Sequence, residues 1–244
     1  MTNLNLRKLN AIDSTNKALK KMLFNNKIVS GDGIWTMNQT NGVGQLGSKW
    51  QSKPNDHLAL SIYKSFDKLD AKWIYSINTA SSLAVVSTLN FFDVPNVSIK
   101  WPNDILSDDK KICGILAENQ INKTHIRSII GFGINLHEQS FPELPSATSV
   151  FIKTNKKILI NNFIEKLSEN LIHFFMFCST KSTSKLNRDL QNHIYGIKKE
   201  SLFEIQKQKI KASIEGVMKN GLLKLKLSNG KIKYFKSKEI KMIY

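Results

Sequence analysis

The sequence is poor in cysteine and has no long hydrophobic run, and each scarcity excludes a class of protein. The 244 residues include only two cysteines, Cys113 and Cys178, which have neither a C-x-x-C spacing nor a paired framework and therefore fit a reducing compartment. No segment approaches the roughly 18 consecutive apolar residues of a membrane span, and residues 1–13 contain no apolar signal core. We therefore expect a cytoplasmic protein that is not inserted in a membrane.

Arginine is also scarce, although the chain is strongly basic. The 36 basic and 19 acidic residues give a net charge of +17, but only Arg7, Arg127 and Arg188 are arginines. Counterion release favours binding of so basic a chain to nucleic acid. Arginine, however, is the usual reader of base edges and phosphates, and the lysines are scattered along the sequence. We therefore expect no specific nucleic-acid site, while the same positive field favours an acidic protein partner.

The pattern of apolar residues predicts a mixture of helices and strands. Hydrophobic residues make up 41% of the chain and charged residues 23%, which is enough apolar surface for a packed core. Helical spacing of apolar residues is found in three segments, 16–24, 71–92 and 161–178. Strand-like runs are found in five segments, 33–37, 58–63, 97–101, 111–118 and 126–136. The fold class is therefore α/β or α+β.

The pattern changes after about Gln191 to short alternating strands, predicted at 202–206, 210–217, 222–227 and 232–235. Asn220-Gly221 and Asn229-Gly230 lie between the last three strands. Such pairs suit two-residue hairpin turns in which both central residues have positive φ. We predict a large domain over residues 1–190 and a small all-β domain over residues 191–244.

Residues 42–47, Gly-Val-Gly-Gln-Leu-Gly, match the G-x-G-x-x-G pattern after a predicted strand. Residues 48–54 then lead to the next strand without a helix. No helix N-terminus is therefore available for a pyrophosphate, which excludes a dinucleotide-binding fold. Taken alone, the segment is either a mobile glycine turn or a loop that closes over an anion with its backbone N–H groups.

A polar Pro-Asn-Asp segment ends one predicted apolar strand, and the chain then folds back into the next strand. This hairpin brings Lys100, Asn103, Asp104 and Lys111 toward one edge of a sheet. The lysines could hold a phosphate or carboxylate of a ligand, and the carboxylate of Asp104 could hold magnesium or an incoming amine. The alternative is a solvated hairpin with charged tips, but Gly114 in a β-branched strand favours close approach by a ligand.

Two further segments have both a structural and a functional interpretation. Gly131 and Gly133 alternate on one face of an apolar strand, so a flat ring could lie there with Asn135 bonded to a neighbouring polar group. Tight packing of a helix on the sheet explains these glycines equally well. Residues 13–16, Asp-Ser-Thr-Asn, are either a helix cap or part of a site.

In this order and at these spacings, the segments resemble the biotin protein ligases. The resemblance rests on residues 13–16, Gln39, residues 42–50, the Lys-Trp-Pro-Asn-Asp run at 100–104, residues 111–114 and residues 131–136. It implies a fold like the catalytic core of class II aminoacyl-tRNA synthetases, in which helices back a mixed sheet. The family's C-terminal SH3-like β-barrel matches the small β domain predicted above.

The resemblance also implies a reaction. Biotin would be activated by ATP to biotinyl-5′-AMP and then transferred to a lysine of a biotin carboxyl carrier domain of a carboxylase. ATP and Mg²⁺ would be needed with biotin, without a dedicated metal site on the protein. No enzyme nucleophile is required, and the five histidines and two cysteines show no triad or metal-ligand spacing. The alternatives are a noncatalytic biotin-binding module and a lipoate-type protein ligase.

Carried over by position, the resemblance assigns roles to three groups of residues. The expected catalytic residues are Lys111, which would contact the biotin carboxylate and the α-phosphate, and Asp104, which would orient the acceptor lysine. The expected biotin-binding residues are Ser14, Thr15, Asn16, Gln39, Val43, Gly44, Gln45, Lys111 and Gly114. The expected ATP- and adenylate-binding residues are Gly42, Gly47, Trp50, Lys100, Asn103 and Asn135.

The chain departs from the family pattern at two places. The family's loop is often written G-R-G-R-x-G-R, but this chain has Val43, Gln45 and Ser48 at the arginine positions, so we expect a weaker hold on the adenylate phosphate. Only 13 residues precede Ser14. They are too few for a DNA-binding domain, so we expect the short form without a repressor role, and we expect that a homodimer can form.

Overall fold

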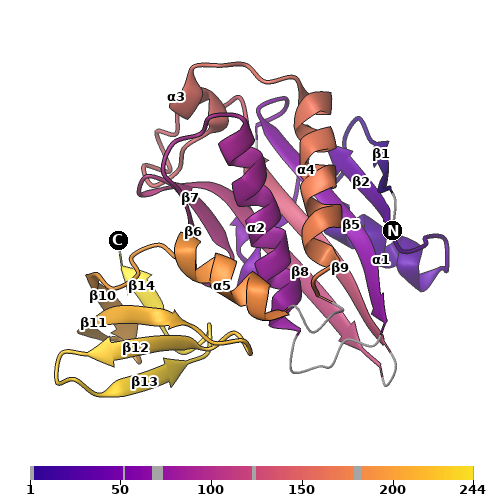
Figure 1. Cartoon of the computed structure of the whole chain (residues 1–244). Helices are drawn as coiled ribbons and strands as arrows, with labels where there is room; N and C mark the ends of the chain where they lie inside the picture. The colour runs from indigo at the N-terminus through magenta and orange to yellow at the C-terminus, as the bar shows by residue number, and fades with distance from the viewer. Residues whose placement is uncertain (1–2, 52, 68–73, 123–124, 179–182, 244) are drawn as a thin grey trace.

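The computed structural model describes residues 3–51, 53–67, 74–122, 125–178 and 183–243. Its largest element is a seven-stranded sheet with the strand order β1-β2-β5-β9-β8-β7-β6 (Figure 1). The strands are β1 Asn5–Lys8, β2 Asp32–Thr36, β5 His57–Asp67, β6 Val97–Lys100, β7 Asp104–Ser107, β8 Lys110–Ile121 and β9 His125–Asn135. β1 and β2 are parallel, and the other neighbours are antiparallel. The predicted mixed sheet is confirmed.

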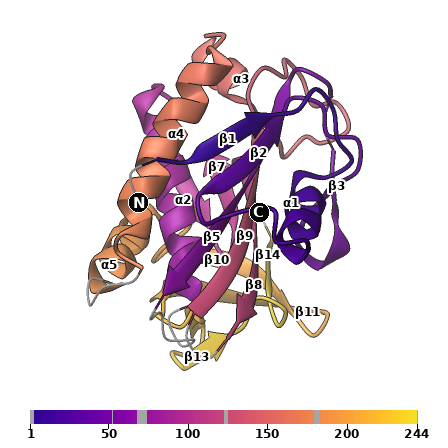
Figure 2. The same cartoon turned by 90° about the vertical axis from the view of Figure 1, so that its right-hand side faces the viewer.

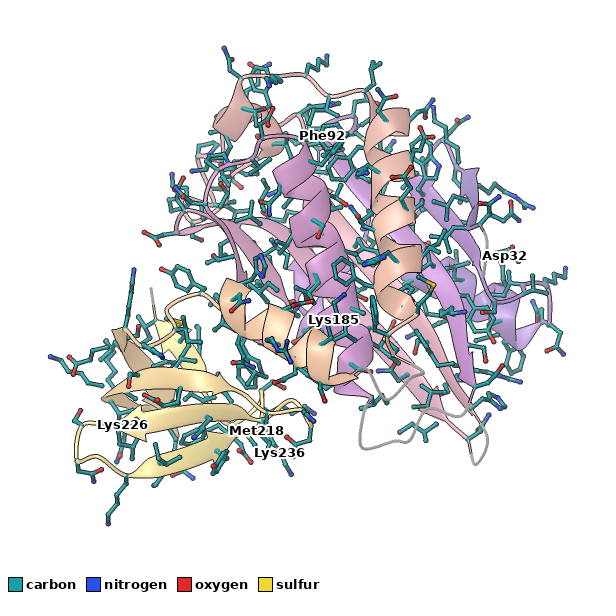
Figure 3. The ribbon with its side chains drawn as sticks, in the orientation of Figure 1. Asp32, Phe92, Lys185, Met218, Lys226 and Lys236 are labelled. Atoms are coloured by element: carbon teal, nitrogen blue, oxygen red, sulfur yellow. The ribbon has the colours of Figure 1, made fainter. Side chains whose placement is uncertain are left out.

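Helices cover both faces of this sheet. α2 (Tyr75–Phe91) and α4 (Ile160–Phe175) lie side by side on one face, and α1 (Thr15–Phe24) lies on the other (Figure 2). Phe92, directly after α2, stacks on Phe163 of α4 with ring centroids 5.4 Å apart (Figure 3). The core between the sheet and α2 is therefore continuous with the packing between the two helices.

α1 has its own small core on the opposite face. It begins at Ser14, which has extended backbone dihedrals and accepts a hydrogen bond from the backbone N–H of Lys17, as a helix cap does. Leu19 of this helix is buried against Ile28, Ile34, Tyr63 and Ile129, which belong to the same small core. This packing fixes the N-terminus of α1 against the sheet.

The C-terminal part forms a five-stranded antiparallel sheet with the order β13-β12-β11-β10-β14, in agreement with the predicted SH3-like unit. Its strands are β10 Glu200–Ile205, β11 Gln208–Val217, β12 Leu223–Leu227, β13 Ile232–Phe235 and β14 Lys241–Ile243. Lys226 and Lys236 in this part and Lys185 of α5 (Thr183–His193) are exposed on separate elements (Figure 3). These lysines are scattered over the surface, as they are in the sequence.

The turns of this sheet correct one expectation. Gly221 and Gly230 have φ of 87° and 80°, but Asn220 and Asn229 do not have positive φ, so the prediction of two positive-φ residues per turn is wrong. Each glycine donates its N–H to the carbonyl three residues earlier, at 2.8 Å in both turns. Each asparagine side chain accepts the N–H two residues later, at 3.3 and 3.1 Å. This side-chain hydrogen bond stabilises the turn without a left-handed backbone at the asparagine. Only the glycine therefore adopts positive φ.

The helices and strands predicted from apolar patterns are present, with ends that differ by a few residues. The predicted helix residues 71–73 lie outside the described part of the chain. The sequence did not predict eight shorter or more polar elements, β1, β3 (Gly42–Val43), the 3-10 helix η1 (Gln45–Gly47), β4 (Lys49–Trp50), β7, α3 (Val150–Thr154), α5 and β14. Helix α5 spans residue 190, where we placed the domain boundary.

The two parts of the chain share one core. Ile99, Leu190, Ile214 and Leu223 belong to the same cluster of buried residues. Trp101 also donates its indole N–H to the backbone oxygen of Gly221, with an N···O distance of 3.0 Å. The C-terminal sheet is therefore packed against the edge of the large sheet that ends at β6.

Candidate active site

A cavity of about 200 Å³ lies between the N-terminus of α1, the glycine loop and the middle of the large sheet. Three of its sides come from segments that are far apart in the sequence. The lining residues are Ser14, Thr15, Asn16, Gln39, Val43, Gly44, Gln45, Ser48, Lys49, Trp50, Ala59, Asn103, Asp104, Lys111, Gly114, Ile115, Leu116, Gly131, Phe132 and Gly133. The cavity contains twelve of the residues predicted to form the site.

The floor of the cavity consists of glycines on two neighbouring strands. Gly114 of β8 is directly opposite Gly133 of β9. A Cβ atom added to Gly133 would lie 2.5 Å from Cε2 of Trp50, and one added to Gly131 would overlap Oδ1 of Asn16. The side-chain-free face predicted from the sequence therefore receives a flat ring, and this ring is the protein's own indole.

The N-terminus of α1 supplies the polar wall. The backbone N–H of Thr15 donates to Oε1 of Gln39 at 3.0 Å. Ser61, fully buried on β5, lies behind this wall, with its hydroxyl oxygen 2.7 Å from Oγ1 of Thr15 and 2.5 Å from Oδ1 of Asn16. Residues 14–16 therefore act both as a helix start and as part of the cavity wall.

Lys111 and Asp104 form an ion pair at the edge of the cavity, with Nζ 2.7 Å from Oδ1. β7 pairs with β8 so that Asp104 is directly opposite Gly114, which lines the cavity. This pairing brings Asp104 close to Lys111 on β8. Nζ of Lys111 also lies 5.5 Å from the ring centroid of Trp50. Asn103 is fixed beside them by a bond from Nδ2 to the backbone oxygen of Ile115 at 2.9 Å. The predicted convergence of these residues is present in the fold.

Lys100 lies in a second cavity of about 360 Å³ between the edge of the large sheet and the C-terminal sheet. Gln45 and Asp104 line both cavities, so the two adjoin. Burial lowers the pKa of Lys100 to about 8; Asp104 opposes this shift, and Lys111 and Lys241 add to it. The charge of this side chain can therefore change near neutral pH.

Three other predicted residues do not line the central cavity. Asn135 is buried, and its Nδ2 donates to the backbone oxygen of Thr148 at 2.9 Å. Gly42 lets the chain pass closely, because an added Cβ would lie 2.5 Å from Nε2 of Gln39. Gly47 has a φ of 78°, and no atom lies within 4 Å of an added Cβ. These residues shape the segments around the site.

A hydrogen-bonded cluster of Lys53, His57 and Glu138 connects two segments near the cavity. Nζ of Lys53 lies 2.8 Å from one carboxylate oxygen of Glu138, and Nε2 of His57 lies 3.2 Å from the other. His57 and Glu138 are both buried. The cluster holds the chain after Trp50 against the chain after β9.

Sequence reasoning missed two residues that support the cavity wall, Ser61 and Glu118. Glu118 supports it because its Oε2 accepts a hydrogen bond from Nδ2 of Asn16 at 2.9 Å. Ser61 interrupts an apolar strand, which is a weak signal of a polar contact. Glu118 follows Gly114 by four residues on β8, so both point to the same face of the sheet. Only the fold shows that α1 crosses the sheet at that point.

No helix in the described ranges is both long and apolar enough to cross a membrane. Within the same residues, no three His, Cys, Asp or Glu side chains are grouped so that they could share a metal ion. The polar groups of the cavity are instead two lysines, a carboxylate, amides and hydroxyls.

The mixed sheet carries a polar, glycine-floored cavity with a lysine and a carboxylate paired at its edge. The sequence pattern of the Biotin/lipoate A/B protein ligase family matches residues 9–135, which is over half of the chain. The chain belongs to this family, and the resemblance noted in the sequence is confirmed.

Curated relatives match part of the chain. A bifunctional ligase/repressor BirA from Bacillus spizizenii is 35% identical over 152 residues, which are 60% of this chain and 46% of that protein. A biotin–[acetyl-CoA-carboxylase] ligase from Mycobacterium tuberculosis is 29% identical over 141 residues, 56% of this chain and 51% of that protein. The matched region thus spans about half the length of these relatives.

A solved structure matches nearly the whole chain. The biotin protein ligase from Aquifex aeolicus in complex with biotin and ATP superimposes with a TM-score of 0.82 and 25% identity, over 98% of each chain. The predicted fold class is therefore confirmed for both parts of the molecule.

Proposed function

We propose that the chain is a biotin protein ligase, which activates biotin with ATP and transfers it to a lysine of a biotin carboxyl carrier domain. The observation that carries this proposal is the Lys111–Asp104 pair, 2.7 Å apart at the edge of a cavity with a glycine floor. The relatives support it: one is named a biotin–[acetyl-CoA-carboxylase] ligase, and another was solved with biotin and ATP.

The first step joins two anions. A carboxylate oxygen of biotin attacks the α-phosphorus of ATP, the bond to the β-phosphate oxygen breaks, and pyrophosphate leaves. The ammonium group of Lys111 offsets the repulsion between the carboxylate and the phosphate and then the charge that develops in the transition state. Lys111 can do so because its Nζ lies at the edge of the cavity. Its ion-pair partner, Asp104, lines the same edge.

The second step needs a nucleophile from the partner. The acceptor amine attacks the carbonyl carbon of biotinyl-5′-AMP, the bond to the AMP oxygen breaks, and the amine proton is released to solvent. Asp104 accepts a hydrogen bond from the amine and orients it. Because Asp104 lines both cavities, we expect the acceptor lysine to arrive from the side of the C-terminal sheet.

Two sets of residues surround the substrates in this proposal. Biotin is held by the wall at Ser14, Thr15, Asn16 and Gln39, by the loop at Val43, Gly44 and Gln45, and by Lys111 and Gly114. ATP and the adenylate are held by Lys100, Asn103 and Trp50, with Gly42, Gly47 and Asn135 shaping the segments around them. Lys100 then serves the phosphates from the second cavity.

Mg²⁺ would be supplied with ATP and would neutralise part of the phosphate charge. Asp104 and Asn103 would offer it oxygen atoms, but the Asp104 carboxylate is already paired with Lys111, so no dedicated metal site is proposed. We further propose a cytoplasmic enzyme with units 1–190 and 191–244, no specific nucleic-acid partner, and the capacity to form a homodimer.

The test is to incubate the protein with ATP, Mg²⁺ and labelled biotin, with and without a carrier domain. We expect biotinyl-5′-AMP without the carrier and labelled carrier with it. A noncatalytic biotin-binding module would bind biotin without releasing pyrophosphate. A lipoate-type ligase would prefer lipoate in a competition with biotin. Either result would contradict the proposal.

A further inference from the structure

We propose that Glu118 is a positioning residue for the ligand, because its carboxylate sets the orientation of the Asn16 amide in the cavity wall. This inference rests on the proposed function, in which Asn16 contacts biotin. Oε2 of Glu118 accepts a hydrogen bond from Nδ2 of Asn16 at 2.9 Å. Glu118 itself is not part of the cavity lining.

Glu118 lies at the end of a row of residues on β8. Gly114, Leu116 and Glu118 alternate along the strand and therefore share one face, where the first two line the cavity. Glu118 continues the row under α1 and reaches a separate surface hollow that it shares with Lys20. Its carboxylate thus connects the outer surface with the back of the cavity wall.

Lys20 holds this carboxylate in place. It lies on α1 and forms an ion pair with Oε1 of Glu118, while Oε2 accepts from Asn16. Each oxygen of the carboxylate therefore has a donor. A carboxylate in its ionised form accepts hydrogen bonds and donates none, so only the NH₂ end of the Asn16 amide can face it.

The opposite end of the amide is thereby fixed. Asn16 is buried, and Oδ1 lies 2.5 Å from the hydroxyl oxygen of Ser61 and above Gly131. A carbonyl oxygen accepts two hydrogen bonds, so Oδ1 has capacity for a ligand N–H beside the Ser61 hydroxyl. The cyclic urea of biotin carries such N–H groups. If the amide rotated by half a turn, it would present NH₂ to them, leaving buried donors without acceptors.

The experiment compares biotin affinity in three variants by calorimetry. Glu118→Gln can donate as well as accept, so it no longer selects one orientation; we expect the Kd for biotin to rise about tenfold. Asn16→Asp places two carboxylates together, and we expect a loss of about a hundredfold. In the double variant that combines both substitutions, the new amide on β8 donates to the new carboxylate on α1. The other oxygen of that carboxylate still faces the cavity, so we expect a Kd within about threefold of wild type.

A loss of biotin affinity at an unchanged melting temperature separates positioning from a merely structural role, which would lower the melting temperature together with the affinity. The matched control is Glu169→Gln, which removes an exposed ion pair with Lys166 on α4 and should leave the Kd unchanged. Thermal unfolding of each variant checks folding, and the Kd for ATP should stay the same throughout. Wild-type affinity in Glu118→Gln, or a double variant as weak as Asn16→Asp, overturns this inference alone. A wild-type protein that binds no biotin overturns the proposed function together with it.

Discussion

The indole of Trp50 occupies the space that a side chain at Gly133 would need, since an added Cβ would lie 2.5 Å from its Cε2. The ring N–H of Trp50 is buried and has no hydrogen-bond partner in the structure. The indole of Trp50 can therefore lie against β9 only because Gly133 has no side chain. Gly133 thus affects the cavity by setting the position of Trp50.

Gly133→Ala should displace Trp50 and raise the KM for ATP by about tenfold or more, because the strand is paired on both sides and cannot move away from the indole. The measurement is biotin-dependent release of pyrophosphate at varied ATP concentration. Gly230→Ala is the control: its φ of 80° costs about 1 kcal/mol of strain, but no atom lies within 4 Å of the new Cβ, and Gly230 does not line the cavity. Similar KM values for both variants would contradict the role of Trp50.

Lys111→Ala should lower the rate of adenylate formation by about 10² to 10³, the usual cost of removing a charge that stabilises the transition state. Lys110→Ala, an exposed lysine at the adjacent position of β8, should keep the wild-type rate. The measurement is the single-turnover formation of biotinyl-5′-AMP. Unchanged synthesis in Lys111→Ala would reject the central assignment of the mechanism.

The affinity for ATP should decrease as the pH rises through the pKa of Lys100. Burial lowers that pKa to about 8, so the side chain is protonated below this pH and neutral above it. Loss of one charged contact to the phosphates should raise the Kd for ATP about tenfold between pH 7 and pH 9. Lys100→Arg stays charged throughout and should show a flatter profile. Identical pH profiles for the two proteins would exclude Lys100 as a phosphate ligand.

Gln45→Arg should slow the release of biotinyl-5′-AMP by about tenfold. Gln45 lines the cavity with a neutral amide, and arginine at this position would supply a charge-assisted fork to the adenylate phosphate. Lys53 cannot fully compensate, because its ammonium group is paired with Glu138. The dissociation rate of preformed adenylate is measured for both proteins, with Thr40→Arg as a control that adds the same charge at an exposed site outside the cavity lining. An equal or faster rate in Gln45→Arg would show that the loop is already held closed.

Much of the fold could be predicted because its main elements follow strong periodic patterns. The strands at 58–63 and 126–136 are mostly apolar and lie side by side in the interior of the sheet. Helix α5 was missed because Leu186 and Leu190 are its only buried apolar residues among polar ones. β7 was missed because it begins at Asp104, inside a segment that looks like a polar turn.

The site was predictable where function depends on residue type and order, and less so where it depends on contacts across the fold. The motifs placed Lys111, Asp104 and Gly114 at one edge, where the structure has them. The roles of Ser61 and Glu118 depend on α1 crossing the sheet, which no local pattern encodes.

The hydrogen bond from Trp101 to Gly221 and the shared core around Ile99 and Leu190 have a thermodynamic consequence. Buried side chains from both parts of the chain lose their packing partners together, so the C-terminal sheet cannot melt and leave the rest intact. The chain should unfold in a single cooperative transition. Heat or denaturant that detaches the small sheet should therefore also dismantle the cavity, so ligand binding should be lost at the midpoint of global unfolding.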